Sequence, residues 1–198
     1  MTAKLSPGIG VVILAAVSTA FAANHVAARV AFDHGASVAS GVVFRAAGTA
    51  SVLFLLMRLQ GVHISLAPAL RGKMLLAGVL VAVQSCCLYS AVSLIPAALA
   101  LLVFQTCPML YVLLSWAMGK EIPRPQAFAA MLLALVGLAL ALDVGSGKSS
   151  DLAPGIAWAF AAAVSFAFVY YMNSHALKSV DGRLRTCVMT AVTAVLML

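Results

Sequence analysis

Charged residues are scarce in this 198-residue chain. They make up 9% of it, and Asp and Glu together number five. A soluble domain carries roughly 25% charged residues. Hydrophobic residues make up 64%, and the mean hydropathy is +1.11. These values exclude an ordinary soluble domain and predict an all-α polytopic membrane protein.

Carboxylates are missing from the apolar segments altogether, since all five lie between them. A membrane-embedded enzyme needs clustered acid, base, nucleophile or metal-ligating groups. The scattered histidines and the absent carboxylates therefore argue against catalysis, although a lipid-modifying enzyme stays open as an alternative. The same absence argues against proton coupling through a carboxylate in this part of the chain.

Cysteine is also infrequent, and its spacing has no metal-binding pattern. The four cysteines are Cys86, Cys87, Cys107 and Cys187. None of them has the spacing of zinc ligands. We interpret all four as small apolar packing residues and expect neither a metal nor another cofactor.

Long apolar runs are what the chain does contain. A membrane-spanning helix needs roughly 20 apolar residues. Six complete segments and the start of a seventh near residue 186 meet this need. The complete segments are 8–28, 37–57, 74–94, 97–118, 127–142 and 155–172. Because the chain is still apolar at Leu198, we expect it to be part of a longer protein.

The basic residues are distributed unevenly between the two sides that these segments define. Nine fall on the side of the N-terminus and two, Arg29 and Lys148, on the other. The positive-inside rule places the N-terminus in the cytoplasm of a cell whose inner membrane holds the protein. The net charge of +7 is thus accounted for by basic residues gathered on one side of the lipid bilayer. No nucleic acid partner is expected.

A short sequence block occurs twice, 147 residues apart. Pro7-Gly8-Ile9 and the run Ala15–Phe21 recur as Pro154-Gly155-Ile156 and the run Ala162–Phe168. Five segments separate the starts of the two copies, and an odd number inverts the second copy. Inverted repeats of this kind build many secondary transporters. We expect a five-helix unit over 1–147 and an incomplete inverted unit over 148–198, both belonging to a ten-helix bundle.

Arg45 is the sharpest candidate for a functional residue, because it lies within the second apolar segment. Burying an arginine in a membrane costs about 2.5–3.5 kcal/mol on insertion scales. Arg45 should therefore face protein or a wet cavity. It either attracts an anionic or carboxylate group of a substrate, or it is a structural arginine held by carbonyl groups or by Asp33.

Other polar residues of the apolar segments are further candidates for a substrate cavity. Gln84 and Gln105 lie at similar depths beside the turn at residues 94–97, so they either bond to each other or line a polar path. Asn24 and His25 lie near the outer end of the first segment. Trp158 and Tyr170 either line the cavity or belong to an aromatic belt at the membrane surface.

The stretch from Ala97 to Leu142 resembles the end of the first repeat of the drug/metabolite transporter superfamily, in its EamA-like branch. The resemblance rests on Pro108, Trp116, Glu121 and Gly137, with Lys120 standing where a glycine is usual. Arg45 matches an arginine often found in the second helix of this family. Residues 155–171 resemble the opening of the second repeat.

This resemblance implies a permease with both ends in the cytoplasm and a central cavity between two inverted repeats. Its members move small organic metabolites, often outward, and Glu121 is a structural residue in them. We expect a small-molecule substrate carried by alternating access. Two copies of the protein could associate as a homodimer. The alternative within the same family is an inactive, truncated remnant.

Overall fold

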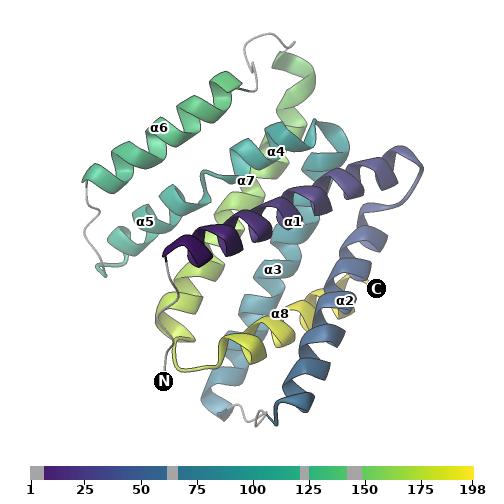
Figure 1. Cartoon of the computed structure of the whole chain (residues 1–198), viewed down its shortest axis with the longest axis vertical. Helices are drawn as coiled ribbons and strands as arrows, with labels where there is room; N and C mark the ends of the chain where they lie inside the picture. The colour runs from purple at the N-terminus through teal and green to yellow at the C-terminus, as the bar shows by residue number, and fades with distance from the viewer. Residues whose placement is uncertain (1–6, 62–66, 121–124, 142–148) are drawn as a thin grey trace.

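The computed structural model describes residues 7–61, 67–120, 125–141 and 149–198. Within these ranges the regular structure is helical (Figure 1). A π-helical turn, Met172–Ala176, directly follows the seventh helix. The helices are α1 (Pro7–Asp33), α2 (Val38–Leu59), α3 (Pro68–Leu94), α4 (Ala97–Phe104), α5 (Cys107–Ala117), α6 (Pro125–Ala141), α7 (Ser149–Tyr171) and α8 (Gly182–Met197).

Five described segments are long and apolar enough to cross a membrane. They are Gly8–Asp33, Val38–Leu59, Pro68–Leu94, Ala97–Ala117 and Leu152–Ala176. The fifth segment expected from the sequence, 127–142, forms α6, whose 17 residues are fewer than the roughly 20 that usually span the hydrocarbon core. The partial seventh forms α8, which begins at Gly182 rather than near residue 186.

Helix α3 is the central element, and it packs against α1, α2, α7 and α8. Small residues permit this close packing. A Cβ atom on Gly78 would lie 2.7 Å from Cβ of Val192 in α8, and one on Gly155 of α7 would lie 2.4 Å from Cγ2 of Ile95. Such contacts require glycine, because membrane helices associate through tight packing of small residues rather than through expulsion of water.

The fourth membrane-length segment is interrupted, as the presence of Pro108 in it predicts. α4 ends at Phe104 and α5 begins at Cys107. Proline has no N–H to donate to the carbonyl group four residues earlier, which here belongs to Phe104. Gln105 and Thr106 form the break between the two helices.

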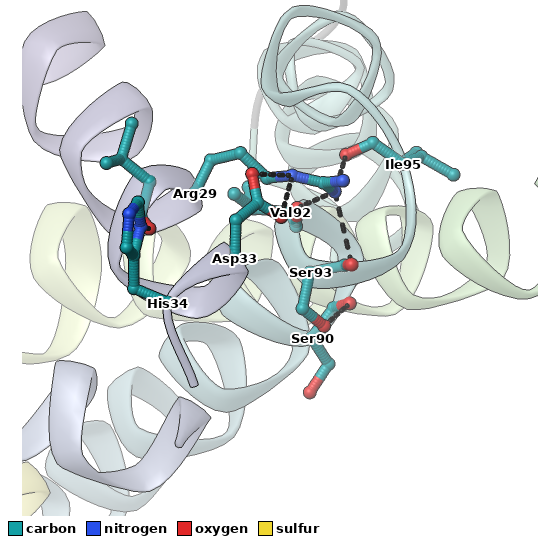
Figure 2. A network of polar contacts seen from close by, with 8 residues as sticks. Arg29, Asp33, His34, Ser90, Val92, Ser93 and Ile95 are labelled. Atoms are coloured by element: carbon teal, nitrogen blue, oxygen red, sulfur yellow. Dashed lines mark hydrogen bonds and ion pairs between the residues drawn. The ribbon is translucent and has the colours of Figure 1, made fainter. Parts of the chain in front are cut away.

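A polar network ties α1 to the turn between α3 and α4 (Figure 2). Nη1 of Arg29 donates to the carbonyl oxygens of Val92 at 2.8 Å, Ser93 at 3.1 Å and Ile95 at 3.3 Å. Its Nε lies 3.2 Å from Oδ1 of Asp33. A cation at the C-terminal end of a helix complements both the unpaired carbonyls and the helix dipole.

Helix α1 extends further than the sequence analysis expected. It ends at Asp33 rather than near residue 28. Asp33 therefore lies within a helix, in its last turn, where it pairs with Arg29 rather than with Arg45. His25 is eight residues from the helix end, or about 12 Å at 1.5 Å per residue, and is deeper than expected.

The start of α8 is fixed by a second charged contact. The carboxylate of Asp181 accepts hydrogen bonds from the backbone N–H of Arg183 at 2.8 Å and from its guanidinium group. These bonds lower the pKa of Asp181 below its usual value. The Arg183 guanidinium also donates to Oε1 of Gln60 just after α2, so the adjacent ends of α2 and α8 are held together.

Candidate functional site

A cavity of about 250 Å³ lies among α1, α2, α3, α4, α7 and α8. Its lining is largely aromatic and aliphatic, with a set of polar side chains contributed by several helices. The aromatic residues in the lining are Phe21, Tyr89, Phe104 and Phe166. The polar residues in the lining are His25, Arg45, Gln84, Asn173, Thr186 and Thr190.

Arg45 reaches the cavity from α2, where Val42 and Ala46 on either side of it are buried against the protein. Its Nη2 donates to Oγ of Ser85 at 2.6 Å. Its guanidinium carbon lies 5.6 Å from the ring centroid of Tyr89, which is a cation–π distance. These two contacts from α3 hold the guanidinium group in the cavity wall.

The polar residues of α3 connect Arg45 to α1. Ser85 donates a long hydrogen bond of 3.4 Å to Oε1 of its neighbour Gln84. The hydroxyl group of Tyr89 accepts a hydrogen bond of 3.0 Å from Nδ2 of Asn24. The ring of His25 lies 5.6 Å from that of Tyr89 and 4.7 Å from that of Phe21. Asn24 therefore positions Tyr89, whereas His25 itself lines the cavity.

Asn173 enters the lining because the backbone changes from α-helical to π-helical at residue 172. Arg185 of α8 stabilises this turn by donating to the carbonyl oxygens of Asn173 at 2.9 Å and Leu177 at 3.2 Å. Short π-helical turns occur frequently at functional sites. In α8, Thr186 and Thr190 are one turn apart and line the cavity together.

Buried polar atoms without a partner are concentrated in this cavity wall. In the described part of the chain four such atoms occur: His25 Nδ1, Arg45 Nε, Asn173 Oδ1 and Ser115 Oγ. The first three belong to residues that line the cavity. Native proteins pair nearly all buried polar groups with protein or water. A cluster of unpaired atoms around one cavity is therefore the arrangement expected of a polar ligand site.

Besides Asn24, three of the residues predicted for the cavity from the sequence lie outside its described lining. Gln105 is exposed at the break between α4 and α5. Trp158 is 44% exposed and Tyr170 is 43% exposed. The ring of Tyr170 packs against Phe166 and Tyr111 at centroid distances of 4.7 and 6.2 Å. None of the three is among the described residues that line the cavity.

The motif residues lie away from the cavity. Pro108 is in the first turn of α5, and Trp116 near the end of that helix is 57% exposed. Gly137 is in α6, with no atom near enough to contact an added Cβ. Glu121 lies outside the described residues.

Sequence analysis missed several residues of the lining. Tyr89 lies one turn after Ser85, so a polar stripe runs along one face of an otherwise apolar helix. Thr186 and Thr190 form a similar stripe in α8. These two polar stripes are the sequence pattern from which Tyr89, Thr186 and Thr190 could have been predicted. Asn173 lines the cavity from a π-helical turn, and no residue pattern in the sequence predicts that turn.

The model of the EamA-like transporter family matches residues 7–142, more than two thirds of the chain. The chain belongs to the EamA-like transporter family. No curated protein and no solved structure matches it. As a member of this family, within the drug/metabolite transporter superfamily, it is a multi-pass membrane protein and a membrane transporter of small molecules. Asn173, Thr186 and Thr190 lie beyond the matched range.

Proposed function

We propose that this EamA-like protein moves a small organic metabolite across the bilayer by alternating access, and that the cavity holding Arg45 is its substrate site. The observation that carries the proposal is the cluster of unpaired polar atoms around that cavity. Arg45, Gln84 and His25 are proposed to make polar contacts to the substrate. Asn24 is proposed to position Tyr89. The resemblance to the superfamily favours outward transport.

The depth of the polar residues supports a site near the middle of the membrane. Gln84 and Arg45 lie ten and seven residues from the nearest ends of α3 and α2, or about 15 and 11 Å at 1.5 Å per residue. The hydrocarbon core is about 30 Å thick. Substrate sites of secondary transporters lie near its midplane, at the interface of the repeats.

The helices that contribute the lining residues support a site between two units. Helices α1 to α4 belong to the proposed repeat over 1–147, whereas α7, the π-helical turn and α8 belong to the proposed inverted unit over 148–198. Each of these elements contributes to the described lining, whereas no described residue of α5 or α6 is part of it. Rocking of one unit against the other would open this cavity to either side in turn.

Cysteine accessibility tests alternating access without knowledge of the substrate. Thr190→Cys is placed in a variant whose four native cysteines are replaced by alanine, and the protein is reconstituted in sealed vesicles. A membrane-impermeant maleimide should react with the new cysteine when it is supplied from either side. The vesicles should stay impermeable to the reagent, because a carrier never opens to both sides together.

Thr193→Cys is the matched control, because Thr193 is fully buried, lies one turn from Thr190 and is outside the cavity lining. It should not react from either side. Reaction of Thr190→Cys from one side only would indicate a fixed cavity, as in an inactive remnant, and would contradict the proposal. Passage of the reagent into the vesicles would indicate a pore instead of a carrier.

A further inference from the structure

We infer that the substrate is a small organic monocarboxylate with an apolar or aromatic body, bound through its carboxylate to Arg45. This inference deepens the proposed function and rests on it. It is argued from the charge of the cavity, the geometry of the guanidinium group and the character of the remaining wall.

The charge of the cavity favours an anion. Arg45 is the one residue of the described lining that carries a charge throughout the physiological pH range, and no Asp or Glu is among the described lining residues. Asp33, the nearest carboxylate expected from the sequence, pairs with Arg29. An arginine inside a membrane protein pairs with an anion, with carbonyls or with water. A carboxylate that enters the cavity would supply the missing counter-charge.

The guanidinium geometry favours a carboxylate. Nη2 donates one of its two N–H groups to Ser85, which leaves the second, while the buried Nε has no partner. Arginine binds planar carboxylates through parallel N–H donors such as Nε and a neighbouring Nη. A second negative charge on the substrate would be buried without a partner, which is costly. The site therefore favours a single carboxylate.

The rest of the wall favours an apolar body of limited size. Phe21, Phe104 and Phe166 line the cavity together with aliphatic side chains. The volume of about 250 Å³ is slightly below the roughly 300–1,000 Å³ of typical small-molecule sites. The unpaired Oδ1 of Asn173 is available as an acceptor for one hydroxyl or N–H group of such a substrate.

A series of probes with one ring and different charges tests this inference. The affinities of benzoate, benzyl alcohol and benzylamine for the purified full chain are measured by calorimetry at neutral pH, with acetate as a carboxylate without a ring. Benzoate should bind at least about tenfold more tightly than each of the other three, because charge-assisted bonds and ring burial both contribute.

Two substitutions in the same helix locate the effect. Arg45→Gln should remove the preference for benzoate over benzyl alcohol. Arg58→Gln is the control, since Arg58 is exposed over the ring of Phe54 and is absent from the cavity lining, and it should keep the full preference. The probe series on the unchanged protein needs no variant, so poor folding of Arg45→Gln would not obscure the result.

The inference is overturned if benzoate does not bind, if the alcohol or the amine binds as tightly, or if Arg45→Gln keeps the preference. The accessibility of Thr190→Cys decides separately whether the protein alternates between the two sides. Loss of charge selectivity with alternating accessibility intact would remove the substrate class and leave the transport mechanism standing.

Discussion

At the scale of single residues, two arginines inside helices have contrasting surroundings. The guanidinium group of Arg29 is bonded to the protein itself, because three backbone carbonyls and Asp33 accept from it (Figure 2). Arg45 has one side-chain partner, one aromatic neighbour and one unpaired nitrogen. These contacts indicate that Arg29 stabilises the fold, whereas the ligand contact proposed for Arg45 would use the nitrogen that the protein leaves unpaired.

Replacement of Arg29 should therefore lower stability. Arg29→Ala leaves the carbonyls of Val92, Ser93 and Ile95 without their shared donor, and bonds to a charged group contribute about 1.5–3 kcal/mol. We expect a loss of about 2 kcal/mol in the free energy of unfolding, measured by thermal or denaturant unfolding in detergent. Arg58→Ala removes an exposed guanidinium group and should change stability by less than about 0.5 kcal/mol. Equal losses for both variants would contradict the structural role of Arg29.

The glutamines show how far sequence could predict the site. Depth along a helix follows from counting residues, and the counts for Gln84 and Gln105 were similar. The direction of a side chain depends on the helix remaining regular. The interruption before Pro108 ends α4 at Phe104, so Phe104 lines the cavity and Gln105 is exposed. Sequence could therefore place Arg45, Gln84 and His25 in the apolar segments, but it could not identify which side chains meet.

At the scale of elements, the contact between α3 and α8 depends on the absence of a side chain at Gly78. Both helices contribute residues to the cavity, Gln84 and Tyr89 from α3 and Thr190 from α8. Their separation at Gly78 is set by the side chain of Val192. The width of the cavity is therefore linked to a packing contact outside it.

Gly78→Ala should destabilise the protein, because the new Cβ would lie 2.7 Å from Cβ of Val192 and overpacking typically costs about 1–3 kcal/mol. Gly72→Ala, in the same helix, is the control, since no atom lies within 4 Å of its added Cβ. It should be neutral or slightly stabilising, because alanine favours helix more than glycine does. Unfolding measurements on both variants test the difference, and an unchanged midpoint for Gly78→Ala would contradict the close contact.

At the scale of the whole molecule, the chain reverses direction from one helix to the next, except that α4 and α5 run the same way (Figure 1). In Figure 1 the N-terminal ends of α1, α3 and α8 lie toward the lower left of the view, as do the C-terminal ends of α2, α5 and α7. The opposite end of each of these helices lies further up and to the right than the first. The basic residues of the sequence are concentrated on the first side, and the positive-inside rule predicts that this side faces the cytoplasm.

Labelling from outside intact cells tests this orientation. Ser37 and Lys178 are both exposed, in the α1–α2 connection and after the π-helical turn. In the variant without native cysteines, Ser37→Cys should react with a membrane-impermeant maleimide applied to whole cells. Lys178→Cys should react only after the cells are opened. Reaction of both residues from the same side would refute the alternating topology.

The sequence by itself determined the class of this protein, because the length and hydrophobicity of its segments exceed what a soluble core needs and match what lipid requires. It also determined the family, and the distribution of its basic residues predicts which side of the membrane the basic connections face. Only the tertiary structure decided the site. The break before Pro108 follows from a proline in the sequence, but which side chains then meet at the cavity depends on packing between segments far apart in the chain. The same holds for Asn173 in the π-helical turn, which meets residues of α1, α2 and α3 at the cavity.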